Sequence, residues 1–331
     1  MKILAIETSC DETAAAVWLD DHLGSNVIAS QEIHNKFGGV VPELASRAHV
    51  RLILPIVKQA LEEAKITKRD LEGIAVTYGP GLAGALLVGL NFAKAAALGL
   101  NIPYVGIHHI EGHIFSNSVL HEGPKLPFLS LIISGGHTQL VLVKEWGNYQ
   151  ILGKTRDDAA GEAFDKVAKM LDLSYPGGPA IDKLAQEGNP NYVKFPKGRF
   201  KDNELDFSYS GLKTAVLYHL RQLSEKERSA QKANIAASFQ EAAVDVLVEK
   251  SILALEKYNL TQLALAGGVA CNKRLRARLE EKSREMGFEL FYPPPVLCTD
   301  NAAMIARAGK FYLESGIKSD FELSPRPTVS L

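Results

Sequence analysis

Hydrophobic residues along this chain form short runs that alternate with longer one-sided patterns, as expected of an α/β protein. Residues 2–7 and 14–19 are apolar and flank a polar segment at 8–13, which predicts two strands joined by a turn. Over 43–65, apolar residues recur at spacings of three and four, which predicts a helix with one buried face. Further strands are predicted at 26–33, 73–77 and 104–106, and further helices at 83–98 and from His108 onward.

A polar, turn-rich segment at 121–127 ends this pattern, and a similar pattern then begins again. The segments 9–13 (SCDET) and 134–138 (SGGHT) both run from serine to threonine between two apolar strands, and 76–84 and 263–272 both lead from a strand through glycines into a helix. We therefore predict a duplicated α/β fold, with lobes at 1–122 and 123–331 around a central cleft. The last helix can pack back on the first lobe. Helices are predicted in the second lobe at 161–173, 182–187, 229–258, 271–286 and 301–316.

Composition narrows the class of protein. The 331 residues include 46% hydrophobic residues and 37 Lys+Arg against 38 Asp+Glu, which excludes a disordered chain. Three widely spaced cysteines exclude a disulfide scaffold. The longest apolar stretch, 86–100, is interrupted by Asn91 and Lys94, and Glu7 interrupts the N-terminal apolar run where a signal peptide would need continuity. We expect a soluble cytoplasmic protein without membrane contact.

The most distinctive chemical feature is the segment 108–113 (HHIEGH) at a predicted helix start. His109 and His113 are four residues apart, so their rings project from one helix face and can share a metal ion. Glu111 lies about 200° around the helix from His109, so it is not counted as a ligand. Ile110 stands where a zincin motif needs glutamate. Two ordinary histidines at a helix start remain an equally good interpretation of this pair.

A third metal ligand would decide between these interpretations. Asp300 precedes the last predicted helix, where its carboxylate is either a ligand or an N-cap. Two histidines and one aspartate would leave coordination positions open, as catalytic metal sites do, and would suit iron, zinc or manganese. The sequence does not place Asp300 near His109.

Glycine-rich turns and neighbouring carboxylates form a second group of candidates. The turn at 134–138 offers backbone N–H groups to a phosphate, and Gly267-Gly268 precedes a helix whose N-terminus attracts anions. A simple hairpin turn is the common alternative, and there is no Walker A motif. Asp165 and Asp182 lie beside tight turns, where they could contact ribose hydroxyls or only cap helices.

Two segments are candidates for contact with nucleic acid. One is the predicted helix at 271–286, which carries six basic residues diluted by Glu280 and Glu281, so a solvated helix face is the more ordinary interpretation. The other is 194–201 (KFPKGRFK), which interleaves cations with aromatic residues inside the long irregular stretch 188–206.

Together these motifs resemble the bacterial tRNA N6-adenosine threonylcarbamoyltransferase family, formerly called O-sialoglycoprotein endopeptidase or glycoprotease. The similarity extends over nearly the whole chain and shows no departure at a site position. The motifs that carry it are 5–13 (AIETSCDET), 109–113 (HIEGH), 134–140 (SGGHTQL), 161–165 (GEAFD), 175–179 (YPGGP), 207–214 (FSYSGLKT), 267–272 (GGVACN) and 299–301 (TDN).

The resemblance implies the actin/Hsp70/sugar-kinase (ASKHA) fold, with two lobes around a central nucleotide cleft, and an acyltransferase. This enzyme would transfer the threonylcarbamoyl group from threonylcarbamoyl-AMP to the N6 amine of adenosine 37, just 3′ of the anticodon, in tRNAs that read codons starting with A, and would release AMP. The resemblance further implies one divalent metal, usually iron(II), on His109, His113 and Asp300. The residues implied for the adenylate site are Ile132, Ile133, Ser134, Gly135, Gly136, Asp165, Gly178, Asp182 and Asn272.

The resemblance also implies partners besides tRNA: an inactive paralogue of the same fold, a small P-loop ATPase, and a separate synthase that makes the adenylate. The adenylate is already activated, so no protein nucleophile is required. The N6 amine must lose a proton, and Asp11 or Glu12 in the first turn is the candidate base. The alternatives are a small-molecule kinase of the same fold, which has no need of the His pair, and a metal-dependent glycoprotein endopeptidase, for which no suitably placed glutamate base is present.

Overall fold

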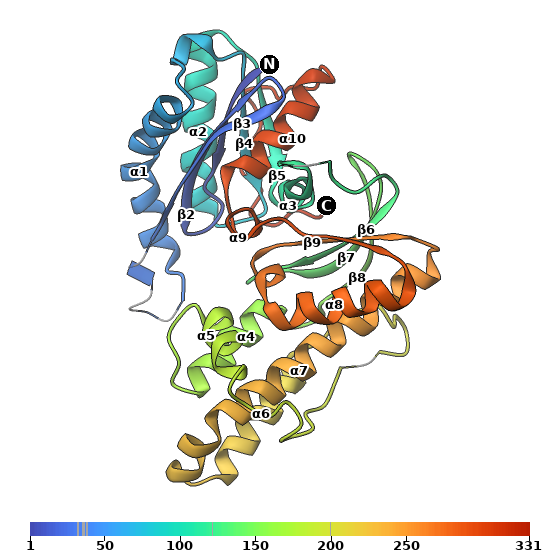
Figure 1. Ribbon diagram of the computed structural model, residues 1–331. Helices are drawn as coiled ribbons and strands as arrows, with labels where there is room; N and C mark the ends of the chain where they lie inside the picture. The colour runs from blue at the N-terminus through green and yellow to red at the C-terminus, as the bar shows by residue number, and fades with distance from the viewer. Residues whose placement is uncertain (32, 35–36, 38, 121, 199) are drawn as a thin grey trace. The chain divides into compact units, whose positions relative to one another are not determined.

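The computed structural model describes residues 1–331 except 32, 35–36, 38, 121 and 199. The contacts between residues divide the chain into two compact units, each containing one five-stranded sheet (Figure 1). The first unit comprises Met1–Gly123 and Pro293–Leu331, and the second comprises Pro124–Tyr292. The second unit therefore ends earlier than the expected lobe 123–331, because residues 293–331, including the last helix, pack in the first unit.

The first sheet has β1 at its centre, in the order β3-β2-β1-β4-β5. Its strands are β1 (Lys2–Glu7), β2 (Glu12–Leu19), β3 (His22–Ser30), β4 (Gly73–Gly79) and β5 (Tyr104–His108). The strand expected at 26–33 instead begins at His22, because a tight turn after Leu19 pairs it with β2 at once. β1 pairs antiparallel with β2 and parallel with β4, and β4 pairs parallel with β5. The ends of β1, β4 and β5 consequently lie at one edge of the sheet.

Helices cover both faces of this sheet (Figure 1). The helices of the first unit are α1 (Pro42–Glu63), α2 (Ala83–Leu100), α3 (His109–Phe115), α9 (Pro295–Cys298) and α10 (Ala302–Glu314). Alternate strand residues such as Leu4 and Ile6 form one buried cluster with α1 and α2. On the other face, a Cβ added at Gly309 would lie 2.3 Å from the Cβ of Ala75, so glycine lets α10 pack close to the sheet.

The second sheet repeats the topology of the first. Its strands are β6 (Phe128–Ile133), β7 (Thr138–Glu145), β8 (Asn148–Lys154), β9 (Gln262–Ala266) and β10 (Glu289–Phe291). Read from β8, the order β8-β7-β6-β9-β10 has two antiparallel pairs followed by two parallel pairs, as in the first sheet. The predicted duplication is therefore confirmed.

The second unit carries five α-helices in its described residues. They are α4 (Ala160–Met170), α5 (Gly177–Ala185), α6 (Ser210–Gln222), α7 (Glu225–Lys257) and α8 (Lys273–Met286). Short 3₁₀ helices occur in the chain at Lys68–Asp70, Ser116–Ser118 and Gly268–Cys271. The expected helix at 182–187 instead begins at Gly177, since the Asp165 carboxylate satisfies the N–H group of Gly177. In this unit, β8, β10 and α6 were not predicted from the sequence.

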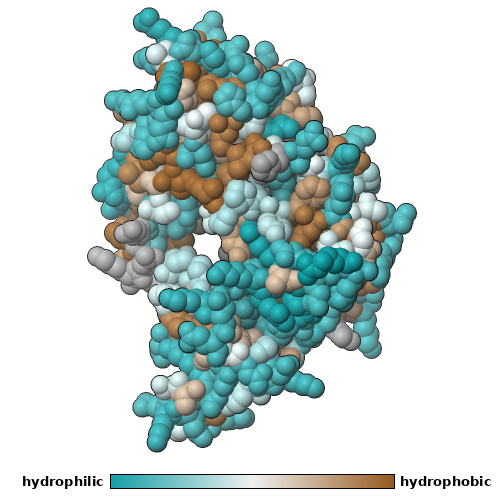
Figure 2. All heavy atoms as spheres, in the orientation of Figure 1, coloured by the Kyte–Doolittle hydropathy of each residue, from teal (hydrophilic) through white to brown (hydrophobic). Residues whose placement is uncertain are grey.

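α2 is, among the described residues, the one helix long and apolar enough to cross a membrane by length and composition. Core helices of soluble proteins meet the same criterion, so this is weak evidence for a span. Leu86, Leu90 and Ala93 are buried in the first unit, whereas Leu87 and Leu98 are exposed. With Val50 and Leu54 of α1, these exposed residues contribute to the apolar surface over the two helices (Figure 2).

We predict that Asp158 stabilises the second unit in a pH-dependent way. Its carboxylate accepts hydrogen bonds from Lys166 of α4 and Lys213 of α6 at 2.9 and 2.7 Å. Burial opposes its ionisation, but the two lysines outweigh burial and hold the pKa of Asp158 below its ordinary value. Asp158→Asn should lower the free energy of unfolding by about 1–3 kcal/mol near pH 7.

The sign of this effect fixes the pH window. A depressed carboxyl pKa contributes stability above the pKa of the unfolded chain, about 4, and the contribution is lost as pH falls through the folded value. Urea unfolding near pH 7 should therefore give Asp158→Asn a lower free energy of unfolding than wild type. Near pH 3 this difference in free energy should become small. Asp202→Asn, at an exposed pair with Arg156, is the control. A difference that stays constant with pH would contradict the prediction.

Candidate functional site

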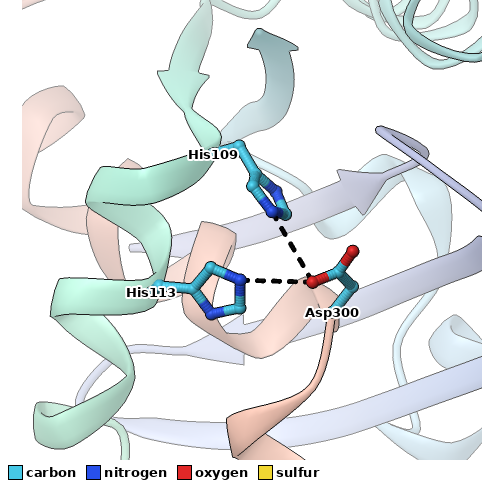
Figure 3. A group of neighbouring side chains, drawn as sticks. All are labelled: His109, His113 and Asp300. Atoms are coloured by element: carbon cyan, nitrogen blue, oxygen red, sulfur yellow. Dashed lines mark hydrogen bonds and ion pairs between the residues drawn. The ribbon is translucent and has the colours of Figure 1, made fainter. Parts of the chain in front are cut away.

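Three side chains from distant parts of the sequence converge in the first unit (Figure 3). Nε2 of His113 lies 3.2 Å from Oδ1 of Asp300, and Nε2 of His109 lies 3.5 Å from the same oxygen. The possible ligand atoms of the three residues all lie within 4.8 Å of one another. The structure thus brings Asp300 to the His pair, which the sequence could not do.

Local structure explains how each of these residues reaches its place. β5 ends at His108, whose Nδ1 accepts a hydrogen bond from the N–H group of Ile110 at 3.2 Å and so caps α3. His109 and His113 follow on one face of that short helix, with ring centroids 4.7 Å apart. Before α10, the N-cap is Asn301, whose side chain accepts from Met304 N–H at 3.1 Å. Asp300 is therefore not the N-cap, and its carboxylate faces the histidines.

The donor set fits a divalent metal ion. Neighbouring ligands on an ion with bonds of about 2.0–2.2 Å lie roughly 3–3.5 Å apart, close to the separations observed here. Nδ1 of His109 is 3.1 Å from Oε2 of Glu7, which leaves Nε2 as the donor atom. Nδ1 of His113 is buried without a hydrogen-bond partner in the described part of the chain. Two nitrogens and one carboxylate leave further coordination positions for a substrate.

Buried charges surround His109. Burial opposes its protonation, but Asp300 and then Glu7 outweigh burial and raise the pKa of His109 to about 9. Burial also opposes ionisation of Glu7, and attraction to His109 reverses this, so the pKa of Glu7 lies below its ordinary value. The two carboxylates thus stabilise positive charge at His109, and the same attraction would favour a bound cation there.

Asp11 lies in the turn between β1 and β2, and Glu12 is the first residue of β2, close enough to Asp300 for its charge to act on Glu12. Burial raises the pKa of Glu12 to about 9, with added repulsion from Asp300 and Asp11. Burial likewise raises the pKa of Cys10 far above its ordinary value, so this thiol stays protonated. Glu12 is therefore near the cluster of His109, His113 and Asp300.

His49 of α1 holds this turn, although the sequence analysis did not single it out. Its Nε2 lies 2.9 Å from the carbonyl oxygen of Cys10, and its Nδ1 lies 2.8 Å from Oγ1 of Thr13. A carbonyl can only accept, so Nε2 donates and Nδ1 accepts from Thr13. Because burial also lowers the pKa of His49, the neutral ring fixes both ends of the segment that contains Asp11 and Glu12.

In the second unit, Ser134, Gly135 and Gly136 form the turn between β6 and β7. The N–H group of Ser134 donates to the carbonyl of His137 at 2.8 Å. A Cβ added at Gly135 or Gly136 would meet no atom within 4 Å, so the backbone of this turn faces open space. Ile132 and Ile133 have fully buried side chains and can offer a ligand only their backbone groups.

Asp165, Asp182 and Asn272 satisfy backbone groups at helix starts. The Asp165 carboxylate accepts from Gly177 N–H at 2.7 Å and from Gly178 N–H. The Asp182 carboxylate accepts from the N–H groups of the first two residues of α8, and Asn272 caps the same helix by accepting from its third residue at 2.9 Å. Burial raises the pKa of both aspartates. The capping interpretation of these carboxylates therefore describes their observed contacts.

Gln240 of α7 links two of these residues and was missed in the sequence. Its side chain donates to Asp182 and its Oε1 accepts from Nδ2 of Asn272 at 2.8 Å. Little in the sequence distinguishes Gln240, because a single polar residue beside the apolar stripe of a long helix is common. Gln240 borders a cavity of about 330 Å³, whose polar lining residues are Asp182, Gln186, Gln240, Glu241, Lys273 and Arg274.

Several of the candidate nucleic-acid contacts are already engaged within the protein. Arg274 makes a two-pronged pair with Glu241 at 2.6 and 2.8 Å, and Lys197 pairs with Asp245 and Glu249 at 2.9 and 2.6 Å. Phe195 is buried. Arg199 of the predicted segment 194–201 lies outside the described residues. In the segment 194–201, Phe195 and Lys197 therefore contact other residues of this protein, which the composition of the segment did not indicate.

Comparison with known proteins gives consistent results. A family model described as tRNA N6-adenosine threonylcarbamoyltransferase matches residues 22–307. A curated protein of that name from Clostridium kluyveri is 52% identical over 334 residues, covering 100% of this chain and 98% of the relative. Another from Clostridium beijerinckii is 53% identical over 331 residues, covering 99% and 98%.

Solved structures show the fold. HypF from T. kodakarensis has a TM-score of 0.64 at 15% identity and covers 96% of this chain, which spans 48% of that one. The activator of 2-hydroxyisocaproyl-CoA dehydratase from Clostridium difficile, solved with bound ADPNP, has a TM-score of 0.53 at 11% identity, covering 97% and 99%. These likenesses, with the duplicated sheet, assign the chain to the ASKHA fold class.

We predict that Gln240→Leu destabilises the second unit by about 1–3 kcal/mol, because the buried Nδ2 of Asn272 then loses its acceptor. Urea unfolding measures the change. Gln186→Leu is the matched control, since Gln186 lines the same cavity but is exposed, and it should stay within about 0.5 kcal/mol of wild type. Equal stability of the two variants would show that the link through Gln240 contributes little.

Proposed function

The chain belongs to the tRNA N6-adenosine threonylcarbamoyltransferase family, and from that premise we propose its substrates, its metal and the roles of its residues. As a member it is an acyltransferase of tRNA threonylcarbamoyladenosine modification. The proposed donor is threonylcarbamoyl-AMP, the acceptor is the N6 amine of adenosine 37 in tRNAs that read codons starting with A, and the second product is AMP.

The observation that carries the proposal is the convergence of His109, His113 and Asp300. His113 and Asp300 are 187 residues apart in the sequence, yet their side chains meet. A small-molecule kinase of this fold would have no use for such a donor set. The endopeptidase alternative needs a glutamate base on the helix of the two histidines, and Glu111 of that helix instead accepts a hydrogen bond from the hydroxyl of Tyr312.

A divalent ion, with iron(II) as the first candidate and zinc or manganese as alternatives, would supply a Lewis acid when bound to these residues. The open turn of Gly135 and Gly136 would donate its N–H groups to the adenylate, which is the leaving group. The adenylate would also contact the backbone groups of Ile132 and Ile133 and the backbone or hydroxyl group of Ser134. Asp165, Gly178, Asp182 and Asn272 would border the rest of the adenylate, with Asp165 and Asp182 held rigid by the helix starts that they cap.

Proton removal from the N6 amine would fall to Asp11 or Glu12, and Glu12 could act only in its ionised form, because its pKa of about 9 keeps most of it protonated near pH 7. Both belong to the segment that His49 holds, and Asp300 lies close enough to affect the charge of Glu12. No protein nucleophile is required, since the mixed anhydride is already activated. Cys10 agrees with this, because its raised pKa keeps the thiol protonated and a protonated thiol is a poor nucleophile.

The proposed partners are those of the resemblance: an inactive paralogue of the same fold, a P-loop ATPase, and a synthase that supplies the adenylate. The exposed apolar side chains of α1 and α2 support contact with another protein. We propose a cytoplasmic location, where tRNA is modified.

The reaction can be tested by nucleoside mass spectrometry on unmodified tRNA incubated with threonylcarbamoyl-AMP, the partner proteins and this chain. We expect threonylcarbamoyladenosine with wild type and with His22→Ala, an exposed histidine of β3. We expect at least a hundredfold slower formation with His109→Ala/His113→Ala, because these changes remove two of three donors. If the double variant still formed the product at the wild-type rate, the proposed transferase activity would stand and the proposed role of the metal would be wrong. No product with active partners would favour the kinase or protease alternatives.

A second prediction concerns the base. Asp11→Ala and Glu12→Ala should be compared in the same assay with Asp21→Ala, an exposed carboxylate of the same unit. A general base contributes about 10²–10⁴ in rate, so at least one of the first two variants should lose that much, while Asp21→Ala keeps the wild-type rate. Unchanged rates in both would show that neither residue takes the proton.

A further inference from the structure

Glu7 is a fully buried carboxylate at the end of β1 that the proposed reaction does not use. Burying an ionised group is costly unless partners compensate for the lost water. Its environment should therefore show what it does.

Both oxygens of Glu7 are held by specific donors. Oε1 accepts a hydrogen bond from the backbone N–H group of Ser9, and Oε2 accepts from the hydroxyl of Thr77 at 2.5 Å. Oε2 also lies 3.1 Å from Nδ1 of His109. The strand end, the next turn and the neighbouring β4 thus fix this carboxylate against one nitrogen of one metal ligand.

The chemistry of these groups determines which nitrogen of His109 carries a proton. An ionised carboxylate only accepts hydrogen bonds, so Nδ1 must donate. The hydroxyl oxygen of Ser9, 3.1 Å from the same nitrogen, is a second group able to accept from it. With the proton on Nδ1 held by Glu7, it is Nε2, the atom 3.5 Å from Asp300, that gives up its proton and offers its lone pair when an ion binds.

We propose that Glu7 is a positioning residue for the metal centre: it holds His109 in the Nδ1–H form with Nε2 directed at the ion. This inference rests on the metal site proposed above and adds a residue that acts through His109 without touching the ion. The nearby negative charge also makes Nε2 a better donor, which a neutral amide in the same place would not do.

The matched control is Glu111. It lies on α3 between the two histidine ligands, is 5% exposed and accepts a hydrogen bond from Tyr312. Glu111→Gln therefore removes a second buried carboxylate, one that is only two residues from His109 in the sequence but on another side of the helix, about 200° around it. Glu7→Gln keeps the size of the side chain and removes its charge.

The test measures Zn²⁺ binding to the full chain by competition with a chromophoric chelator. Glu7→Gln should bind Zn²⁺ about 10–100-fold more weakly than wild type, and Glu111→Gln should stay within about threefold. Thermal unfolding of each metal-free variant verifies that it is folded. Equal affinity of wild type and Glu7→Gln would overturn the role of Glu7 and leave the metal site intact. No binding by wild type would overturn both the metal site and this inference.

NMR of the zinc-loaded wild-type chain labelled with ¹⁵N-histidine gives an independent test that needs no variant. We expect His109 to show a slowly exchanging proton on Nδ1 and zinc coordination at Nε2. In Glu7→Gln this proton signal should move upfield even where the metal still binds, which a merely structural loss of packing would not produce. Coordination through Nδ1 of His109 would overturn the proposal.

Discussion

The candidate metal cluster of His109, His113 and Asp300 depends on the parallel pairing of β1, β4 and β5. Strands that run in the same direction end at the same edge of a sheet, so Glu7, Thr77 and His109 emerge side by side from three different strands. β5 continues without a loop into α3, and His108 is both its last residue and the cap of the helix. A shift of one residue in this register would turn Glu7 to the opposite face of the sheet and remove it from His109.

The third ligand comes from the other end of the chain and depends on the packing of α10. This helix lies against β1, β2 and β4, and the contact of Gly309 with Ala75 determines how closely it approaches. Asn301 caps α10, and the carboxylate of the preceding Asp300 faces the histidines instead of capping the helix. Small residues far from the ligands therefore determine where Asp300 lies.

The sequence predicted those features that depend on local pattern. The strand at 2–7, the helix over 43–65 and the repeated strand–turn–strand unit all follow from residues adjacent in the chain, and the structure contains them. His109 and His113 share a helix face for the same reason. Asp300, Gln240 and His49 owe their positions to contacts across 187, 32 and 39 residues, which no local pattern reveals. The composition of 194–201 made it one candidate for contact with nucleic acid, but it could not reveal that Lys197 forms ion pairs within the protein.

Duplication gave the two units one turn each at the same place in the sheet, after the central strand, and the two turns have diverged in charge. In the first unit the turn after β1 contains Asp11 and leads directly into Glu12, next to a cluster suited to a cation. In the second unit the turn after β6 contains Gly135 and Gly136, whose exposed backbone suits an anion. A metal-assisted transfer with a nucleotide leaving group needs both kinds of site. The same hairpin can provide either one, because the sheet fixes its position while the turn residues determine the sign of the charge that it attracts.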